Sequence, residues 1–287
     1  MLRRVDGAVS RLAERPRVAV AQTAPEVGAV DRNVAAAVDR ILRLRDRADL
    51  VVLPELFTTG YRREGLDHAA LAEPVPDGPS VQRLARAARE AGVAVVGSIL
   101  ERDGDAIYDA SVVIDRDGDF LARYRKTHLY PAEMPFFDAG DELVVASLDT
   151  GMRIGLAICF EHAFPEIFTS LALAGASLIV ISSAVPVGFE YLLDLRTRAR
   201  AQDNQVFVAS ANLVGFDGQT RWCGRSAIVD PRGQIIAEAD GIDEATIIAE
   251  LDMAIVASER HQEQALAHRR PALYRPTLGI PAAHERT

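Results

Sequence analysis

Three separate segments of the chain carry side chains that could together hydrolyse an amide-like bond. Cys159 ends an apolar run, Glu55 ends another, and Lys126 follows a third strand-like run. Such hydrolysis needs a nucleophile, a proton shuttle and a group that stabilises the tetrahedral oxyanion. Cys159 can supply the first and Glu55 the second, while Lys126 and the backbone N–H of Phe160 can supply the third. The residues therefore predict a cysteine hydrolase that uses neither histidine nor metal.

The position of Cys159 in the sequence favours a reactive thiol. It stands at the tip of a predicted buried strand, where a helix is expected to begin, and helix N-terminal N–H groups favour thiolate over thiol. The alternative is a buried and inert cysteine, as free cysteines often are. Glu55 could likewise cap the next segment, and Lys126 could be a surface charge at a strand end. Strand ends, however, are where polar side chains converge on a cleft.

Composition sets broad limits on the fold and on the partners. With 287 residues, 49% of them hydrophobic, the chain can bury a large core, and no composition break divides it. A net charge of −9 argues against nucleic acid or an anionic membrane as the main partner. The longest apolar stretch, residues 171–187, is interrupted by glycine, serine and proline, and the first residues contain no apolar signal core. We therefore expect a soluble, cytoplasmic protein.

The hydrophobic pattern alternates between strands and helices. Strands are predicted at residues 17–22, 50–53, 93–100, 106–115, 120–124, 143–145, 152–158, 177–181, 205–211, 225–230, 233–238 and 245–251. Helices are predicted at residues 31–47, 80–91, 165–174, 189–203 and 253–261. The near-continuous Val, Ile, Ala and Leu in the strands indicates sheets that are buried on both faces, with helices outside. We expect a flexible N-terminal segment (1–15), one domain (16–275) and a C-terminal tail (276–287).

Three motifs resemble, in order and spacing, the signature segments of the nitrilase superfamily, the carbon–nitrogen hydrolases. They read Leu53-Pro54-Glu55, Arg125-Lys126-Thr127-His128-Leu129-Tyr130, and Ile158-Cys159-Phe160-Glu161 followed by Phe164-Pro165-Glu166. The similarity covers about residues 16–275. Each motif alone is a weak signal, whereas three in the correct order are strong evidence of membership.

The resemblance implies an α/β fold, a four-layer αββα sandwich of two mixed β-sheets covered by helices. It also implies a Glu–Lys–Cys triad at Glu55, Lys126 and Cys159, no cofactor and no metal. Glu133 is implied as a residue that positions the substrate or Lys126. Members of the family pair across the helices beside the nucleophile, so we expect a homodimer or a higher homo-oligomer.

Two residues beside the nucleophile are further candidates for positioning the substrate, Phe160 and Glu161. The family usually carries aspartate two residues after the nucleophile, where this chain has Glu161. The additional methylene could alter the local loop without changing the reaction class. Glu161 could also cap the helix expected after Cys159 rather than touch the substrate.

The resemblance implies hydrolysis through a thioester, with a small aliphatic amide, an amino-amide or an N-carbamoyl amine as substrate. Relatives that act on acidic amides often carry arginine three or four residues after the nucleophile, a residue that can pair a carboxylate. This chain has His162 and Ala163 there, so we expect a neutral or cationic small-molecule substrate, with Glu190 as a candidate to receive an ammonium.

Other functions are compatible with the same residues. A nitrilase that converts a nitrile to acid and ammonia is the nearest alternative, and amide hydrolysis is the commoner activity. A glutaminase module would need a tightly bound partner enzyme, and a non-catalytic binding scaffold would not need all three triad residues. His128 and His162 have no partner at metal-ligand spacing. Cys159 and Cys223 are too few for a disulfide framework.

Overall fold

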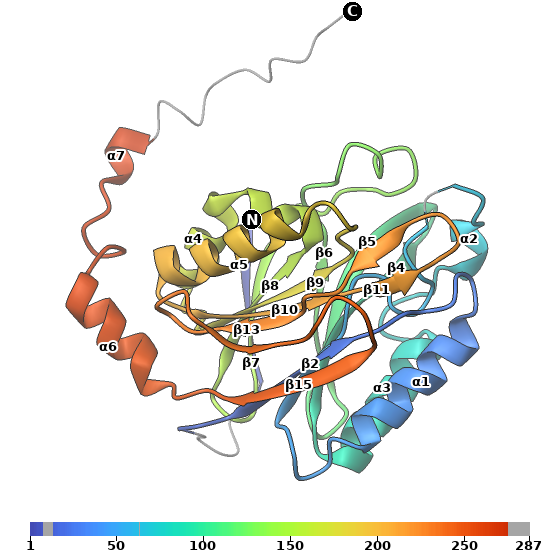
Figure 1. Ribbon diagram of the computed structural model, residues 1–287, viewed down its shortest axis with the longest axis horizontal. Coiled ribbons are helices and arrows are strands. Elements are labelled where there is room, and N and C mark those ends of the chain that lie inside the picture. The colour runs from blue at the N-terminus through green and yellow to red at the C-terminus, as the bar shows by residue number, and fades with distance from the viewer. Residues whose placement is uncertain (8–13, 63, 275–287) are drawn as a thin grey trace, which may run out of the picture.

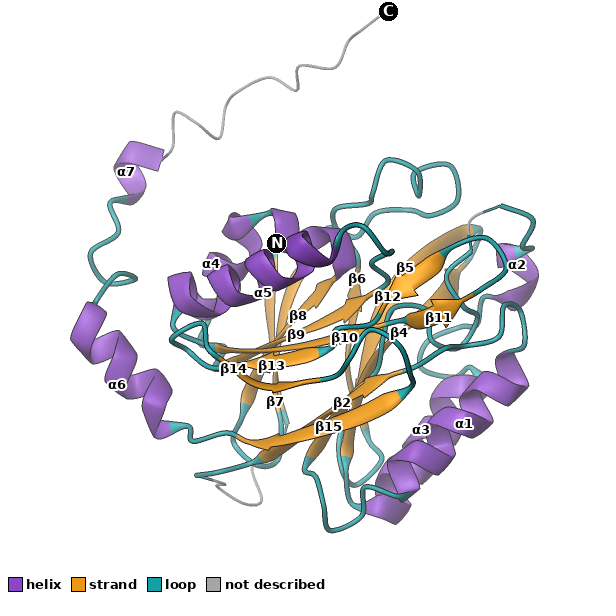
Figure 2. Ribbon diagram, viewed as in Figure 1, coloured by secondary structure: helices purple, strands orange, loops and turns teal. Residues whose placement is uncertain are grey.

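Two large β-sheets stack face to face between two layers of helices in the computed structural model, which describes residues 1–7, 14–62 and 64–274 (Figure 1). Helices α1 (Val30–Leu42) and α3 (Pro79–Ala91) cover one outer face, and α4 (Pro165–Leu173) and α5 (Glu190–Asn204) cover the other (Figure 2). The predicted α/β fold, a four-layer αββα sandwich, is therefore confirmed.

One sheet has six strands and the other has seven, and both mix parallel with antiparallel pairs. The six-stranded sheet runs in the order β15 (Ala245–Glu250), β2 (Arg17–Gln22), β3 (Leu50–Val52), β4 (Ala94–Asp103), β5 (Ala106–Ile114) and β6 (Phe120–Arg125). The seven-stranded sheet runs in the order β1 (Leu2–Asp6), β7 (Leu143–Ser147), β8 (Arg153–Ile158), β9 (Leu178–Ser183), β10 (Phe207–Asn212), β13 (Ala227–Val229) and β14 (Ile235–Glu238).

Alternating side chains along the strands build three separate apolar layers. In β2, Val18 and Val20 pack between the two sheets, whereas Ala19 and Ala21 pack against α1 and α3. This is the period of two expected of a strand whose faces are both buried. In β8, the layer between the sheets contains Ile154, Leu156 and Ile158. Ala157 packs instead in the layer that contains side chains of α4. The sheets therefore meet across a dry interior, and their strand ends converge at one rim.

Shorter elements complete the described part of the chain. They are α2 (His68–Leu71), the hairpin β11 (Val214–Phe216) and β12 (Arg221–Cys223), α6 (Ala254–Glu263) and α7 (Pro271–Tyr274). Helix α6 follows the last strand and lies beside the edge of the seven-stranded sheet, where Arg260 donates to the carbonyl of Ala176 at 2.8 Å. None of the helices in the described ranges is long and apolar enough to cross a lipid bilayer.

The N-terminal segment differs from the prediction, because residues 2–6 form β1 rather than a flexible end. This strand pairs in parallel with β7, and its side chains are mostly exposed. Backbone hydrogen bonds at a sheet edge need no apolar side chains, so the polar sequence gave no signal for the strand. Residues 8–13 and the predicted tail (276–287) lie outside the described residues.

Other differences concern where elements begin and end. Helix α1 stops at Leu42 instead of continuing to residue 47, and a turn with Asp46 at φ 60° follows it. The hairpin of β11 and β12 was not predicted. Helices α4 and α5 expose Leu173, Tyr191 and Leu195, on the face where we expect a second copy to dock. The dimer stays a prediction.

Candidate active site

A fully buried ion cluster lies at the rim where strands of the two sheets end. Lys126 Nζ is 2.6 Å from Glu55 Oε1, 2.8 Å from Glu133 Oε1 and 3.7 Å from Asp109 Oδ2. All four side chains have no exposed surface. Two of the three residues named for the triad are therefore in direct contact, and Glu133 joins them.

The ends of β3 and β6 place the two charged groups of this cluster. Glu55 follows β3, and its backbone N–H donates to the carbonyl of Ser183 at 3.4 Å, which ties the end of one sheet to the other. Leu56, the next residue, has φ of 46°, so the chain turns sharply away from the strand. Lys126 follows β6, and its backbone N–H donates to the carbonyl of Asp109 in β5 at 2.9 Å.

Glu133 is fixed by donors on several elements. Its Oε1 accepts from Lys126 and from the hydroxyl of Tyr61 at 2.5 Å, and its Oε2 accepts from the backbone N–H of Tyr130 at 2.7 Å. Three donors on one carboxyl group fix its orientation. Burial, followed by the charge of Glu133, raises the pKa of Tyr61 well above its usual value, so this hydroxyl keeps its proton. Glu133 thus contacts Lys126 directly, and its role in positioning Lys126 or the substrate stays a prediction.

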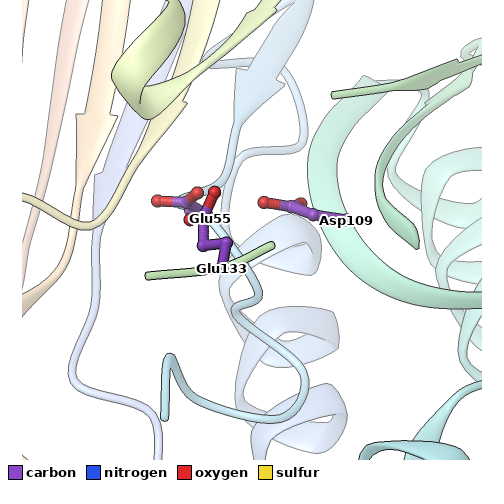
Figure 3. Close-up of side chains that lie close together, drawn as sticks. All are labelled: Glu55, Asp109 and Glu133. Carbon is purple, nitrogen blue, oxygen red and sulfur yellow. The ribbon is translucent and has the colours of Figure 1, made fainter. Parts of the chain in front are cut away.

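The ammonium of Lys126 lies among three carboxyl groups, at a position that a metal ion could otherwise take. One oxygen from each of Glu55, Asp109 and Glu133 lies within 4.8 Å of the others, and Figure 3 shows their side chains converging. Such a group of oxygens could hold a metal ion, but Lys126 Nζ is within reach of all three. Burial lowers the pKa of Lys126, and the charges of Glu55, Glu133 and Asp109 outweigh it, so the pKa lies well above its usual value. Lys126 is therefore charged.

Cys159 borders a pocket of about 310 Å³, and Tyr61, which donates to Glu133 of this cluster, lines the same pocket. The pocket is lined by Tyr61, Tyr130, Cys159, Phe160, His162, Ala184, Val185, Pro186, Phe189, Leu192, Arg196, Thr220 and Trp222. The wall is mainly apolar and aromatic, with few polar groups, as is usual for a small-molecule site. Cys159 is half-buried, and the charges of Glu55 and Lys126 act on its thiol. The structure thus brings the three triad residues to one place, and their catalytic roles stay a prediction.

The environment of the Cys159 thiol is different from the one predicted. No α-helix begins there: Cys159 starts a short 3₁₀ turn (Cys159–Ala163) with φ of 43°, and α4 begins only at Pro165. Burial, and then the charge of Glu55, raises the pKa of the thiol well above its usual value, although Lys126 acts in the opposite direction. The α-helix start that we expected to favour the thiolate is therefore absent at Cys159, and burial favours the protonated thiol. The thiol needs a base, and Glu55 is the carboxylate whose charge acts on it most.

Glu161 braces the two loops that carry the nucleophile and Lys126. Its Oε2 accepts from the backbone N–H of Ile158 at 2.7 Å, and its Oε1 accepts from the hydroxyl of Tyr124 at 2.5 Å and the backbone N–H of Thr127 at 2.8 Å. The side chain is fully buried and does not line the pocket. The structure therefore does not place Glu161 against a substrate. It links Ile158, before the nucleophile, to Thr127, after Lys126.

Phe160 and His162 do line the pocket. The ring of Phe160 meets Tyr130 edge-on, with centroids 5.3 Å apart, and its backbone N–H lies in the first turn after Cys159, where helical N–H groups have no internal partner. Burial, and then the charges of Arg196 and Arg200, lowers the pKa of His162 to about 3. His162 is therefore neutral at ordinary pH, and it cannot hold an anionic substrate by charge.

Three pocket and cluster residues were not found from the sequence. Asp109 sits inside the apolar run of β5, and an acidic residue in a strand buried on both faces is a signal that could have revealed it. Arg196 reaches the pocket from α5. Trp222 stands on the unpredicted hairpin and meets Tyr61 edge-on, with centroids 5.4 Å apart. Glu190, in contrast, does not line the pocket. Its carboxylate accepts from the backbone N–H of Gly188 at 2.7 Å.

Comparison with known proteins finds one family over most of the chain. The model of the carbon-nitrogen hydrolase family matches residues 17–260. A hydrolase encoded in the 5′ region of pqqF in Pseudomonas protegens is 43% identical, over 79% of this chain and 80% of its own length. A nitrilase of Pyrococcus abyssi is 35% identical over 85% of this chain and 92% of its own. A 2-oxoglutaramate amidase of Bacillus subtilis is 34% identical over 79% of this chain and 86% of its own.

The fold has a similarly extensive match among solved structures. An amidase of the nitrilase superfamily from Nesterenkonia AN1 superposes with a TM-score of 0.80 and 27% identity, covering 94% of this chain and 100% of the other. The similarity extends through both sheets and their helices, since nearly the whole of each chain is matched.

Proposed function

Because the chain belongs to the carbon–nitrogen hydrolase family and is an enzyme of the amidohydrolase type, we propose that it releases ammonia from a small amide through a thioester on Cys159. The observation that carries this proposal is the ammonium of Lys126, which lies between Glu55 and Glu133 and acts, with Glu55, on the thiol of Cys159 at the border of the pocket. A carboxylate and an ammonium beside a protonated thiol are the groups that acyl transfer requires.

In the first half of the proposed reaction, Glu55 accepts the thiol proton and the sulfur attacks the amide carbon. Lys126 and the backbone N–H of Phe160 stabilise the negative charge that develops on the amide oxygen. As the carbon–nitrogen bond breaks, Glu55 returns its proton to the leaving nitrogen, which departs as ammonia. The acyl group remains on Cys159 as a thioester, and Glu55 is again a carboxylate.

In the second half of the proposed reaction, water hydrolyses the thioester. Glu55 accepts a proton from the water as its oxygen attacks the thioester carbon. The carbon–sulfur bond then breaks, the acid is released, and Glu55 returns the proton to the sulfur of Cys159. Each cycle therefore consumes one water and leaves every side chain in its starting protonation state.

The relatives support an amide as the substrate. Two different mutants of the Nesterenkonia amidase have been crystallised, one in complex with butyramide and one with the acetamide moiety of fluoroacetamide added to its active-site cysteine. The Bacillus subtilis relative is named for 2-oxoglutaramate, an amide that also bears a carboxylate. The Pyrococcus abyssi relative is named a nitrilase, so nitrile hydrolysis is the second candidate.

A panel assay tests the proposed function. Wild-type protein is incubated with aliphatic amides, N-carbamoyl amines and the nitriles of the same carbon chains, and released ammonia is measured. We expect the amides to give the highest kcat/KM, because the buried ammonium is placed to stabilise a carbonyl oxygen. Faster turnover of the nitriles would favour the second candidate, and no ammonia from any member of the panel would contradict the proposed reaction.

The charge of the substrate follows from the pocket wall, and here the structure leads us to revise our expectation. Among the described residues that line the pocket, Arg196 is the one charged side chain, and no aspartate or glutamate lines it. Arg196 is half-buried and has no ion pair or hydrogen bond to any residue that the structure describes. We infer that the far end of the substrate is neutral or anionic, and we no longer expect a cationic substrate.

Removing the charge of Arg196 tests this inference. Three amides of equal chain length, ending in a methyl group, a carboxylate and an ammonium, are compared in wild type and in Arg196→Gln. We expect kcat/KM for the carboxylate amide to fall about 10- to 100-fold in the variant, because a charged hydrogen bond is lost. The methyl amide should change little. Arg198→Gln, on the same helix but outside this pocket, is the matched control. Equal losses on all three amides, or a wild-type preference for the ammonium amide, would refute the inference.

A further inference from the structure

Asp109 is held in the ion cluster by a defined set of hydrogen bonds. Its Oδ1 accepts a short hydrogen bond from the hydroxyl of Ser98, in β4. The oxygen of Ser98 in turn accepts from the backbone N–H of Leu56 at 3.0 Å, so the hydroxyl proton points toward Asp109. Asp109 Oδ2 faces the cluster, 3.7 Å from Lys126 Nζ. The side chain is therefore oriented toward Glu55 and Lys126 from the adjacent strands.

The charges in this cluster do not balance. Glu55, Asp109 and Glu133 would carry three negative charges, whereas Lys126 supplies one positive charge, and all four side chains are fully buried. Two uncompensated charges in a dry interior are strongly unfavourable, and buried carboxyl groups then retain a proton. Tyr61 and Cys159, which also face the cluster, are neutral when protonated and do not offset the excess.

The hydrogen bonds indicate where the retained proton lies. Glu133 accepts from three donors, so both of its side-chain oxygens have partners. In contrast, Glu55 Oε2 and Asp109 Oδ2 are buried acceptors without a donor among the described residues. The two carboxyl groups are close enough to hydrogen-bond when one of them carries a proton. One proton between them satisfies both oxygens and removes one of the excess charges.

We propose that Asp109 is a positioning residue that shares one proton with Glu55 and keeps this proton while Glu55 accepts the proton of the Cys159 thiol. This rests on the proposed function of Glu55 as the base. At rest, Asp109 is protonated and donates to the Glu55 carboxylate. After proton transfer from the thiol, both carboxyl groups are neutral and the charges of Glu133 and Lys126 cancel. Glu55 then releases its proton to the leaving nitrogen, and Asp109 keeps its own throughout.

The distances to Lys126 favour the negative charge on Glu55, because Lys126 Nζ is 2.6 Å from Glu55 Oε1 but 3.7 Å from Asp109 Oδ2. Burial raises the pKa of both carboxyl groups, which agrees with one proton retained by the pair. Burial raises the pKa of Asp109 to about 6, even though Lys126 lowers it. Burial, and then the charges of Asp109 and Glu133, raises the pKa of Glu55 well above its usual value, while Lys126 acts in the opposite direction. The charge of Asp109 is one of the causes that raise the pKa of Glu55, so a charged Asp109 favours the protonated form of Glu55, which cannot accept a proton. A protonated Asp109 removes that charge and adds a donor to Glu55.

Two neutral substitutions of similar size separate this role from a structural one. In Asp109→Asn the amide can still donate to Glu55, whereas in Asp109→Leu no donor remains. A hydrogen bond to the charged form of a carboxyl group lowers its pKa. The acidic limb of the kcat/KM profile should therefore stay in place for Asp109→Asn and move up by about one pH unit for Asp109→Leu. Loss of the Ser98 contact could destabilise Asp109→Leu, but it would not move this limb.

Infrared spectroscopy of the unliganded protein gives a second reading that does not depend on turnover. Wild type at and below the Asp109 pKa of about 6 should show the carbonyl band of a buried protonated carboxyl group, and this band should be absent from Asp109→Asn. Wild type without the band, or variants with identical acidic limbs, would overturn the proposal. If wild type shows the band but none of the proteins releases ammonia from any amide, the shared proton stands and the proposed function fails instead.

Discussion

Replacing Cys159 with alanine is expected to lower ammonia release from the best amide by about 10⁴-fold or more, because no thioester can form without the nucleophile. Lys126, Glu55 and the pocket would remain, so substrate should still bind with an affinity similar to that of wild type. Ammonia release and substrate binding are measured on the same preparation. Mass spectrometry of wild type, quenched during turnover, should find the acyl group on the peptide that contains Cys159.

The second cysteine provides the matched control for this experiment. Cys223 is also buried, and its sulfur accepts from Nδ2 of Asn212 at 3.2 Å. Serine can make the same contact, so Cys223→Ser should keep most of the activity. Turnover that survives in Cys159→Ala, or an acyl group found on Cys223, would rule out the proposed nucleophile. A lower melting temperature of Cys159→Ala alone would instead indicate a folding defect.

The sequence predicted the elements that carry strong hydrophobic periodicity, together with the site residues that follow them. Strand β2 was predicted with its observed bounds, and α3 to within one residue, because buried faces impose a clear pattern on both. Lys126 and Cys159 were found because each comes directly after such a strand, and Glu55 because it follows β3 within three residues. The raised pKa of the Cys159 thiol was not predicted, because burial and the nearby charges depend on segments that are far apart in the sequence.

The pocket wall could not be predicted from local pattern. Arg196 and Trp222 reach it from a helix and from a short hairpin, and their side chains meet only because the two sheets stack. Which of several arginines on α5 faces a pocket depends on small rotations of the helix, which the spacing of apolar residues does not fix. The substrate charge that we expected from His162 and Ala163 therefore rested on too small a part of the wall.

One signal in the sequence went unused. Lys126 is the only lysine in the chain, and all thirty-one other basic side chains, histidines apart, are arginines. Arginine is planar and branched, whereas the ammonium of lysine is a compact charge on a thin stem. The cluster places three carboxyl groups within 3.7 Å of one nitrogen in a space with no exposed surface. A chain that otherwise uses arginine for its strongly basic positions retains lysine where only a small cation fits.

Replacing Lys126 with methionine is therefore expected to reduce kcat by about 10²- to 10³-fold, the usual cost of losing one donor to the oxyanion. It should also destabilise the fold, because Glu55, Glu133 and Asp109 lose their common cation. Removing one partner of a buried ion pair costs about 3–5 kcal/mol of unfolding free energy. The size of this loss should depend on pH, since the carboxyl groups can be neutralised by protons instead.

The sign of that dependence follows from the raised carboxyl pKa values. Glu55 already titrates above its unfolded value with Lys126 present, and the loss of Lys126, which lowers its pKa, raises it further. Folded Lys126→Met therefore binds more protons than the unfolded chain between the usual carboxyl pKa and the raised one. Its stability should fall as pH rises through that window and recover toward acidic pH.

Urea unfolding at several pH values measures this effect, and Lys126→Arg is the matched variant that keeps the charge. Arginine cannot place a single nitrogen against three acids, so Lys126→Arg should also lose activity, but its unfolding free energy should depend less on pH than that of Lys126→Met. If the two variants had identical pH profiles, the ammonium would not be the charge that balances these carboxylates. A Lys126→Met variant with wild-type turnover would remove Lys126 from the reaction altogether, and the buried cluster would then serve the fold alone.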